Sequence, residues 1–409
     1  MKKVLIWDYF PQKNIGGPAG YLYNVHKYLE EHPTSQITFL TDIVKKNKPN
    51  VEFQYQQINV RRRRIPFAQI FYQLEKAFEY CLKPFLTIPD EMPRNIDVNQ
   101  FDFVHIHQVD QVSQFTKLYP HYKGKLILTS HCPCPFTIER MDSAASKNSS
   151  LHKLFVRLNP ILLLPESRAY DKADYIMFPC EGARESYEKN PKIKQTFVKN
   201  NHKFFYVPSA IMDYQIGSRR VQKLSKFGIP NDAFVITYFG RHIPIKGYDI
   251  LKDVGIKLLE KFPNLYFLCG GDGPITPPTH PRWKELGYIN NLDDLLTQSS
   301  LYVLPNRETY FDLITLQILR AGVPLVMSST GGNKLFMELP SMEVNGLVFF
   351  DIANVENLEY IISKMINLKQ TSIEEYKEMG ESNRKLFEKY FMLDKYINNY
   401  ISCINNLEI

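Results

Sequence analysis

The feature that most constrains the fold is a strand–loop–helix–strand pattern between Leu301 and Asn333. A short apolar run at 301–304 ends at a proline, and a stretch with helical spacing follows until Gly322 stops it. A second apolar run at 323–327 leads into a turn of small residues. In open parallel sheets ligands bind at the carboxyl ends of the strands, and the helix N-terminus there favours an anion or a sugar hydroxyl.

The same alternation recurs along the whole chain. Buried strands are predicted at 3–7, 37–41, 52–55, 101–107, 125–131, 173–178, 234–239, 265–269, 286–289 and 345–349. A boundary is expected near Val207 to Asp213, where one β/α series ends and the next begins. The pattern therefore predicts an α/β protein with two Rossmann-like doubly wound domains that face each other across a cleft, at residues 1–207 and 208–387.

Composition places the chain among ordinary globular proteins. It has 409 residues, of which 44% are hydrophobic and 23% charged, and it holds no apolar run of 18 residues, so no membrane span is expected. The first residues predict a β-strand rather than a signal peptide. Cys132-Pro133-Cys134 is too short for a CxxC unit, so free thiols in a reducing cytosol and no metal site are expected. A net charge of +7 suits phosphorylated ligands or an anionic membrane surface and is too weak to indicate nucleic-acid binding.

Several residues stand where strands end. Arg241 and Lys246 share the loop after 234–239, and two cations there suit a diphosphate, although a solvated surface loop has the same composition. Gly16 and Gly17 follow the first strand, which allows close backbone approach to a phosphate or sugar, or simply a tight turn. His131 ends the strand after 101–107, so polar residues of two successive strands are expected at one sheet edge.

A basic cluster and an apolar stripe suggest a contact with a membrane. Arg61 to Arg64 precede an aromatic-rich amphipathic stretch that continues to Phe85. This arrangement is typical of an interfacial anchor, and it equally fits a helix packed on the sheet after a solvated charge run. The apolar stretch from Leu154 to Leu164 is open to the same two interpretations.

Several motifs, in their order along the chain, resemble a known family. They are IGGPAGYLYNV, FDFVHIH, ILTSH, ADYIMFP, VPSAIMD, GRHIPIKGYDIL, GDGP, the stretch from Glu308 to Gly332, and NGLVFFD. Together they are similar to retaining glycosyltransferases of the GT-B fold, of the family 4 (group 1) type. The resemblance also implies that a terminal helix within 388–409 crosses back onto the first domain.

The resemblance implies a role for particular residues. Arg241 and Lys246 would hold the diphosphate of the donor, His131 would lie near the transferred sugar, and Glu308, or Thr309, would contact the donor sugar. The predicted catalytic residues are Glu308, His131, Arg241 and Lys246. The donor site as a whole is predicted to include Gly16, Gly17, Arg241, Lys246, Tyr288, Ile289, Glu308, Thr309, Phe311, Asp312, Leu313 and Gln317.

Three positions depart from the family pattern, and one of them is Glu308, which lies one position earlier than the first carboxylate of the family signature. Gln317 stands where the second carboxylate of the paired-glutamate signature binds the ribose, and an amide can still hydrogen-bond ribose hydroxyls. Asp312 stands where glycine is usual, which places a carboxylate near the phosphates.

The function implied is transfer of a hexose-type sugar, with retention, from a nucleotide sugar to a glycan or lipid-linked acceptor in surface polysaccharide or glycoconjugate synthesis. A UDP-sugar is the expected donor, without a metal or other cofactor. The protein is expected in the cytoplasm, with peripheral contact through 61–86 on the inner face of the membrane. The alternative is a non-catalytic GT-B-like subunit that binds sugar or protein in support of a partner glycosyltransferase.

Overall fold

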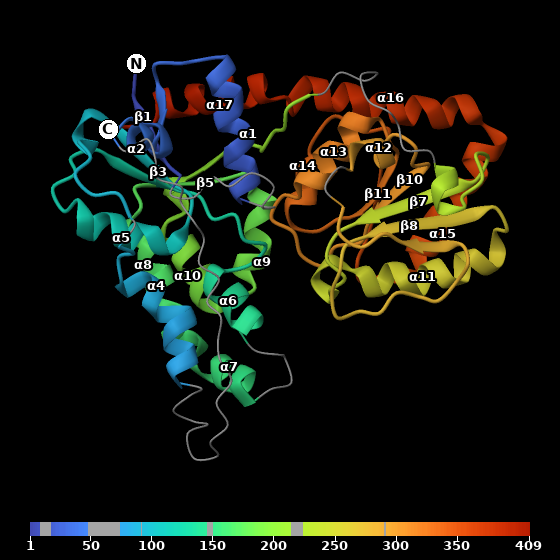
Figure 1. Cartoon of the computed structure of the whole chain (residues 1–409), viewed down its shortest axis with the longest axis horizontal. Coiled ribbons are helices and arrows are strands. Elements are labelled where there is room, and N and C mark those ends of the chain that lie inside the picture. Colours follow the sequence, from blue (N-terminus) through green and yellow to red (C-terminus); the bar gives the residue numbers. More distant parts are fainter. Residues whose placement is uncertain (9–17, 48–73, 91, 145–149, 214–223, 290–291) are drawn as a thin grey trace. The chain divides into compact units, whose positions relative to one another are not determined.

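The computed structural model describes residues 1–8, 18–47, 74–90, 92–144, 150–213, 224–289 and 292–409. The chain divides into two compact units. Unit 1 comprises Met1–Phe178, Ser186–Val207 and Asn398–Ile409, and unit 2 comprises Pro179–Glu185 and Pro208–Ile397. Each unit contains one six-stranded parallel sheet with helices on both faces (Figure 1). The predicted class, two doubly wound α/β domains, is confirmed.

The sheet of unit 1 has the order β2-β1-β3-β4-β5-β6, and every neighbouring pair is parallel. Its strands are β1 (Val4–Trp7), β2 (Ile37–Phe39), β3 (Phe103–Ile106), β4 (Lys125–Leu128), β5 (Tyr175–Phe178) and β6 (Phe204–Tyr206). From β1 the chain goes outward to β2 and then back to β3 on the other side. The order therefore reverses between β1 and β3, which is the position where doubly wound sheets open a ligand crevice.

Helices cover both faces of this first sheet (Figure 1). On one face lie α1 (Pro18–Glu31) and α17 (Leu393–Asn406), and on the other α5 (Val109–Leu118), α8 (Leu164–Lys172) and α10 (Pro191–Lys199). Among the described residues, the remaining α- and π-helices of this part of the chain are α2 (Leu40–Asn47), the π-helix η2 (Phe78–Leu82), α4 (Lys83–Leu86), α6 (Phe136–Ala144), α7 (Ser150–Leu162) and α9 (Glu185–Glu188).

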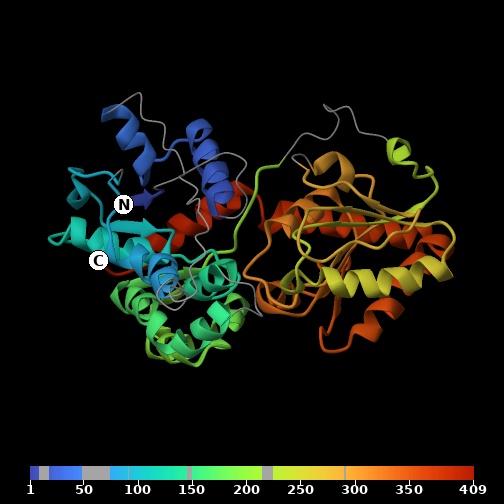
Figure 2. The ribbon, with the colours of Figure 1, turned by 60° about the horizontal axis from the view of Figure 1, so that its bottom comes forward.

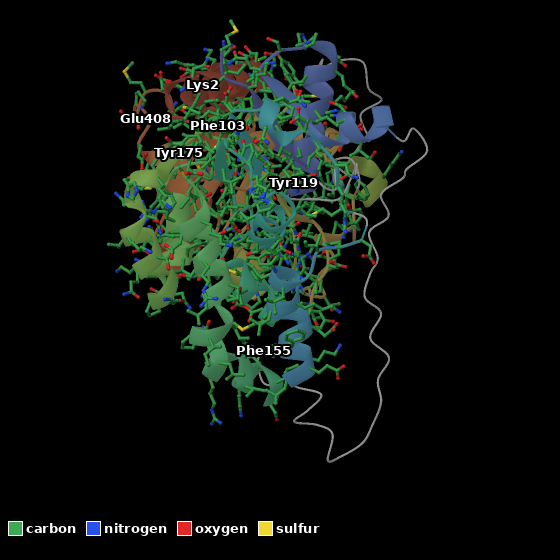
Figure 3. The ribbon with its side chains drawn as sticks, turned by 90° about the vertical axis from the view of Figure 1, so that its left-hand side faces the viewer. Lys2, Phe103, Tyr119, Phe155, Tyr175 and Glu408 are labelled. Carbon is green, nitrogen blue, oxygen red and sulfur yellow. The ribbon has the colours of Figure 1, made fainter. Side chains whose placement is uncertain are left out.

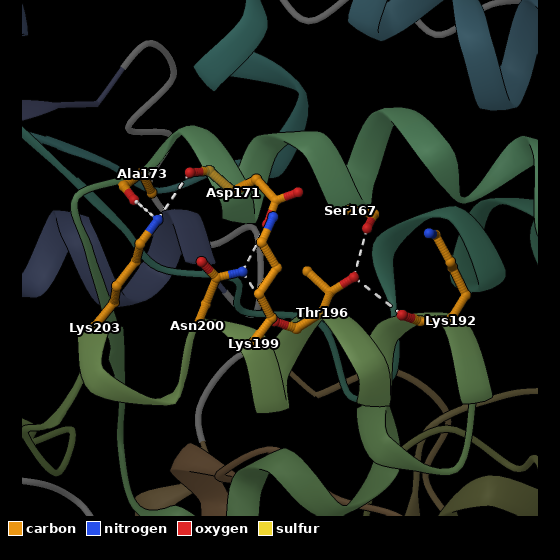
Figure 4. A network of polar contacts seen from close by, with 8 residues as sticks. All are labelled: Ser167, Asp171, Ala173, Lys192, Thr196, Lys199, Asn200 and Lys203. Atoms are coloured by element: carbon orange, nitrogen blue, oxygen red, sulfur yellow. Dashed lines mark hydrogen bonds and ion pairs between the residues drawn. The ribbon is translucent and has the colours of Figure 1, made fainter.

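A polar network joins α8 to α10 (Figure 4). Asp171 accepts hydrogen bonds from the Lys199 ammonium at 3.0 Å and the Asn200 amide at 2.7 Å, while the hydroxyls of Ser167 and Thr196 lie 2.5 Å apart. Lys203 donates to the carbonyls of Asp171 and Ala173 at 2.8 Å each. These bonds hold the two helices together on one face of the sheet.

The sheet of unit 2 has the order β12-β11-β10-β7-β8-β9 and is also parallel throughout. Its strands are β7 (Phe234–Phe239), β8 (Leu265–Gly270), β9 (Trp283–Glu285), β10 (Leu301–Leu304), β11 (Leu325–Ser328) and β12 (Leu347–Phe350). The chain runs from β7 to β8 on one side and from β10 to β11 on the other. The switch point of this sheet therefore lies between β7 and β10.

The helices of unit 2 form a layer on each face of its sheet (Figures 1 and 2). One layer holds α11 (Tyr248–Lys261) and α15 (Val355–Thr371), whose apolar residues join those of β7 and β8 in one buried cluster. The other holds α12 (Asp293–Leu296), α13 (Leu313–Ala321) and α16 (Ile373–Tyr390). The short helix α14 (Lys334–Met337) follows the turn after β11.

Some predicted elements differ from the observed ones. The strand predicted at 286–289 is displaced: Trp283–Glu285 pairs with Phe267–Cys269, and the chain then turns at Gly287, where φ is +64°. The strand predicted at 37–41 ends at Phe39, because Asp8 accepts a hydrogen bond from the Thr41 amide and α2 begins. The strand predicted at 52–55 lies outside the described residues.

The division of the chain also differs from the predicted one at two places. Residues 179–185 belong to unit 2, where Glu185 accepts a hydrogen bond from the Gly331 amide at 2.8 Å. The return to unit 1 begins at Asn398 rather than at 388, since Phe391 packs on Phe336 in unit 2. The returning segment is fixed to unit 1 near its end, where the Tyr175 hydroxyl and the Glu408 carbonyl are 3.0 Å apart (Figure 3).

Within the described residues, no helix is both long enough and apolar enough to cross a membrane.

Candidate functional site

Two loops meet at the switch point of the second sheet. One follows β7 and spans 240–247, and the other follows β10 and spans 305–312. The Arg307 amide donates to the Ile245 carbonyl at 2.9 Å, which fastens one loop to the other. Gly247 begins α11 with φ +68°, and a Cβ there would lie 1.8 Å from the Pro305 carbonyl oxygen. Only glycine permits this approach of the two loops.

An ion pair occupies the centre of this arrangement. The ammonium of Lys246 lies 2.6 and 2.8 Å from the two carboxylate oxygens of Asp312. Both side chains are largely buried, with 17% and 18% of their surface exposed. Asn306 donates its amide to the second Asp312 oxygen at 2.5 Å. The lysine predicted to hold a diphosphate is thus bound to a carboxylate of the neighbouring loop.

The N-terminus of α13 opens at the same edge. Asp312 is its N-cap residue, yet its side chain makes no capping hydrogen bond, because the carboxylate turns to Lys246 instead. Leu313 begins the helix, and Gln317 follows one turn later, half-buried. The first amide groups of a helix carry partial positive charge, so this terminus favours an anion.

The other cation and the acid of the predicted site lie in the same two loops. Arg241 follows β7 and is exposed, and its side chain forms no ion pair with any of the described residues. Glu308 is half-buried, and its amide lies 3.4 Å from the Ile245 carbonyl oxygen. The structure therefore gathers Arg241, Lys246, Glu308 and Asp312 at one sheet edge.

The turn after β11 and the helix α14 pack against the loop that follows β10. The Gly332 amide donates to the Thr309 carbonyl at 3.1 Å, and the Phe311 ring stacks on Phe336 with centroids 5.9 Å apart. The side-chain oxygens Thr309 Oγ1 and Asn306 Oδ1 are buried and have no hydrogen-bond partner among the described residues. Buried polar atoms are normally satisfied by a partner, a water or a ligand, so this loop has capacity for further hydrogen bonds.

The residues predicted to line a nucleobase follow β9. Tyr288 is 72% exposed, whereas Ile289 is half-buried and its Cδ1 atom would lie 2.6 Å from a Cβ added at Gly270. Ile289 thus covers the end of β8 on the same sheet edge. The predicted pair Gly16 and Gly17 lies outside the described residues.

In unit 1, histidines gather at the carboxyl ends of β3 and β4. His107 Nδ1 and His131 Nε2 are 2.9 Å apart, so one of these nitrogens donates to the other, and the two rings are stacked. The ring of His105 lies 4.0 Å from that of His107, and its nitrogens bond the hydroxyls of Tyr400 at 2.8 Å and Thr129 at 2.7 Å. Alternation along β3 places His105 and His107 on one face of the sheet.

Burial keeps these histidines neutral. It lowers the pKa of His131 to about 3 and holds the pKa values of His105 and His107 well below the usual range. Neighbouring imidazoles add to the effect for His105 and His107, because a second positive charge nearby is unfavourable. At neutral pH the cluster therefore offers hydrogen bonds and no charge.

Two features of these edges were missing from the sequence-based prediction. Arg307 forms a two-pronged ion pair with Asp249, with both N–O distances at 2.7 Å, and this pair joins the loop after β10 to the first turn of α11. His107 pairs directly with His131. The residue types at strand ends were visible, but their side-chain directions were not, because loop geometry sets them.

Comparison with known proteins finds a family match within the second unit. The family described as glycosyl transferases group 1 matches residues 233–368, from the start of β7 to α15. These residues include every predicted donor-site residue except Gly16 and Gly17.

Residues 233–368, here called the group 1 domain, are similar to this family.

Relatives of the chain share low identity. The alpha-D-kanosaminyltransferase of Streptomyces kanamyceticus is 24% identical over 196 residues, 44% of this chain and 50% of that protein. The O-antigen biosynthesis glycosyltransferase WclY of Escherichia coli is 22% identical over 44% of this chain and 49% of its own length. An uncharacterized 41.2 kDa protein in the cps region of Klebsiella pneumoniae is 22% identical over 75% of this chain and 80% of its own. The chain thus spans about half the length of two of these relatives.

Solved structures support the fold. HepE of Anabaena in complex with UDP superposes over 100% of both chains with a TM-score of 0.59 and 12% identity. The sucrose-phosphate synthase of Thermosynechococcus elongatus gives a TM-score of 0.61 with 12% identity, over 99% of this chain and 98% of the synthase. Both units of the chain, and not only the group 1 domain, therefore have the fold of GT-B glycosyltransferases.

Proposed function

We propose that this protein is a glycosyltransferase that uses a nucleoside-diphosphate sugar and retains the configuration at the transferred carbon. The observation that carries the proposal is the meeting of Lys246, Arg241 and the N-terminus of α13 at the switch point of the group 1 domain. Two cations and a helix N-terminus form a site for a diphosphate. UDP is the proposed nucleotide, since the HepE structures with UDP and UDP-glucose share this fold.

The same groups account for the chemistry proposed. As the glycosidic bond to the diphosphate breaks through an oxocarbenium-like state, negative charge grows on the leaving phosphate. Arg241, Lys246 and the dipole of α13 would stabilise that charge at an edge where they are already in place. In this proposal Glu308 contacts the donor sugar, Gln317 the ribose, and His131 of unit 1 the transferred sugar. The cations of the chain would do this without a metal ion.

The test of this proposal is a screen of donors followed by turnover. Thermal shifts would be measured with UDP-, GDP- and ADP-sugars, because a ligand of the folded state stabilises it by mass action. The sugar that stabilises the chain would then be followed by proton NMR for release and for the anomer formed, with and without EDTA. We expect one nucleotide class to stabilise the protein and EDTA to have no effect. Failure of all three classes to bind would contradict the proposal.

The acceptor is proposed to be a glycan or a lipid-linked glycan, with unit 1 in peripheral contact with the inner face of the membrane. In the predicted contact 61–86, residues 61–73 lie outside the described part, whereas Leu74 and Phe78 are each 44% exposed and Phe85 is buried. The helix α7 offers a second surface: it contains no acidic residue, and Val156 and Ile161 are 56% and 59% exposed.

Two cationic side chains lie on the same surface of α7. Lys153 and Arg157 are exposed, and with Val156 and Ile161 they follow helical spacing on one face. An apolar and cationic face is typical of a helix that lies on an anionic bilayer. Flotation with vesicles of neutral lipid, and of neutral plus anionic lipid, tests this contact. Val156→Asp with Ile161→Asp should abolish binding to the anionic vesicles, whereas Tyr360→Asp, an exposed site in unit 2, should not.

A second candidate function rests on Asp312 and Gln317. If the Lys246–Asp312 pair never opens, the domain cannot hold a diphosphate through Lys246, and the chain would act as a silent subunit that supports a partner glycosyltransferase. The donor screen separates the two, since a silent subunit releases no sugar from any nucleotide sugar.

A further inference from the structure

The carboxylate of Asp312 stands in a position that a phosphate site ordinarily avoids. It caps the N-terminus of α13 in sequence, but its oxygens bond Lys246 and Asn306 and none of the helix amides. The side chain is 18% exposed, so little water screens its charge. A negative charge therefore already lies where the proposed function places the negative phosphates.

Among the described residues of the two loops, one side chain forms an ion pair with this carboxylate. Lys246 is its only ion-pair partner there, and Asn306 contributes a neutral amide. Arg307, the next cation along the loop, is bound to Asp249 instead. A diphosphate that takes Lys246 therefore leaves the Asp312 carboxylate without its cation and beside a like charge.

The cost of that arrangement depends on the charge of the ligand. In a nucleotide sugar both phosphates are esterified, so the diphosphate carries about two negative charges. After transfer the terminal phosphate is free, and since its second pKa is near 6 it carries almost one charge more at neutral pH. Repulsion by a fixed carboxylate therefore weakens binding of the product more than binding of the donor.

We propose that Asp312 is a resident counter-ion of Lys246 that selectively weakens binding of the nucleoside diphosphate product and so speeds its release. This inference rests on the proposed function. Lys246 exchanges Asp312 for the donor's diphosphate when the donor binds, and the carboxylate recovers the lysine as the product leaves. Asp312 acts as a specificity residue, because it shifts the balance between donor and product.

The test is isothermal titration of UDP, UMP, uridine and UDP-glucose into wild type, Asp312→Asn and Asp213→Asn. Asparagine keeps the shape and the oxygen acceptor of Asp312 and removes only its charge. Asp213 is a matched control, since it is a carboxylate of unit 2 in an ion pair with Arg384 and has a comparable exposure of 30%.

We expect Asp312→Asn to lower the Kd of UDP by roughly tenfold, equivalent to ~1.4 kcal/mol. The Kd of UDP-glucose should fall less than that of UDP. The Kd of UMP should also fall less, because UMP carries less negative charge than UDP. The Kd of uridine, which has no phosphate, should not change. With turnover, the same variant should lower the inhibition constant of UDP and slow kcat while lowering KM. Asp213→Asn should bind each ligand as the wild type does.

Three results would overturn the inference in different ways. Equal Kd values of wild type and Asp312→Asn for UDP would show that Asp312 does not oppose the product, while the proposed function would stand. A UDP affinity that rises with Mg²⁺ in wild type and is lost in Asp312→Asn would show that the carboxylate binds a cation with the phosphates. If UDP binds no variant and the donor screen finds no UDP-, GDP- or ADP-sugar that stabilises the protein, both the inference and the proposed function fail.

Discussion

At the scale of single residues, a buried carboxyl group makes the stability of the first unit depend on pH. Glu166 is fully buried and accepts hydrogen bonds from the amides of Phe136 and Thr137 at 2.9 and 2.8 Å. Burial raises its pKa from 4.5 to about 7, despite these bonds. A carboxyl whose pKa is raised on folding stabilises the folded state at low pH, and this contribution is lost as the pH rises through 7.

Glu166→Gln should therefore remove a pH dependence. Between pH 5 and pH 8 the wild type should lose on the order of 2–3 kcal/mol of unfolding free energy relative to the variant, since glutamine cannot ionise. Urea unfolding at each pH measures this difference. Curves for wild type and variant that run parallel across the range would contradict the assignment, whatever their offset.

The residues of the candidate site could be predicted from the sequence, but the contacts between them could not. Lys246 was predicted at a donor site from its position after a strand, and Asp312 from the resemblance to the family; the structure places them in contact. That they bind one another could not be predicted, because the contact joins residues 66 positions apart and depends on the paths of two loops. The pairing of His107 with His131 escaped prediction for the same reason.

At the scale of elements, glycines decide how closely the loops approach. Gly247 and Gly287 have nearly the same backbone conformation, with φ +68° and +64°, but different surroundings. A Cβ at Gly247 would meet the Pro305 carbonyl oxygen at 1.8 Å, whereas a Cβ at Gly287 would meet nothing within 4 Å.

The pair Gly247→Ala and Gly287→Ala separates backbone strain from steric conflict. Gly287→Ala should cost about 1 kcal/mol of unfolding free energy, from the left-handed conformation alone. Gly247→Ala should cost about 3 kcal/mol, because the two loops must also move apart. Denaturant unfolding of both variants gives these values, and equal losses would show that the contact with Pro305 is easily relieved.

The elements themselves were predicted where they are long or strongly apolar. The strands from 234–239 and 301–304 were found, since each is a continuous buried run. The edge strand β6 was missed, because its three residues are only half-buried and carry no alternation. The strand β9 was placed three residues late, since the apolar Leu286 and Ile289 gave a stronger signal than Trp283–Glu285.

At the scale of the whole molecule, the end of the chain completes the first unit. The Tyr400 hydroxyl bonds His105 Nδ1 at 2.8 Å in a buried position, and Asn405 bonds Gln36 at 3.1 Å. Only the resemblance to the family predicted this return, because no local pattern shows which unit a terminal helix joins. Unit 1 should therefore depend on residues 398–409 for stability.

Tyr400→Phe tests that dependence, because it removes only the hydroxyl group of Tyr400. Removal of the hydroxyl leaves His105 Nδ1 buried without a partner, which should cost about 1–2 kcal/mol of unfolding free energy in unit 1. The chain has two tryptophans, Trp7 in unit 1 and Trp283 in unit 2, so each unit has its own fluorescent probe. In a Trp283→Phe background the Trp7 transition should shift, whereas in a Trp7→Phe background that of Trp283 should not. Equal shifts of both probes would contradict the account.

The central claim is that the carboxyl edge of the group 1 domain binds a nucleoside diphosphate through Lys246. The most direct measurement is calorimetric titration of UDP into wild type, Lys246→Ala and Lys252→Ala. Lys252 is a matched lysine of the same domain whose ammonium donates to the Thr276 carbonyl at 2.8 Å. Loss of a charge-assisted contact should raise the Kd of UDP about tenfold or more in Lys246→Ala and leave it unchanged in Lys252→Ala. Wild-type affinity of Lys246→Ala for UDP would contradict the claim.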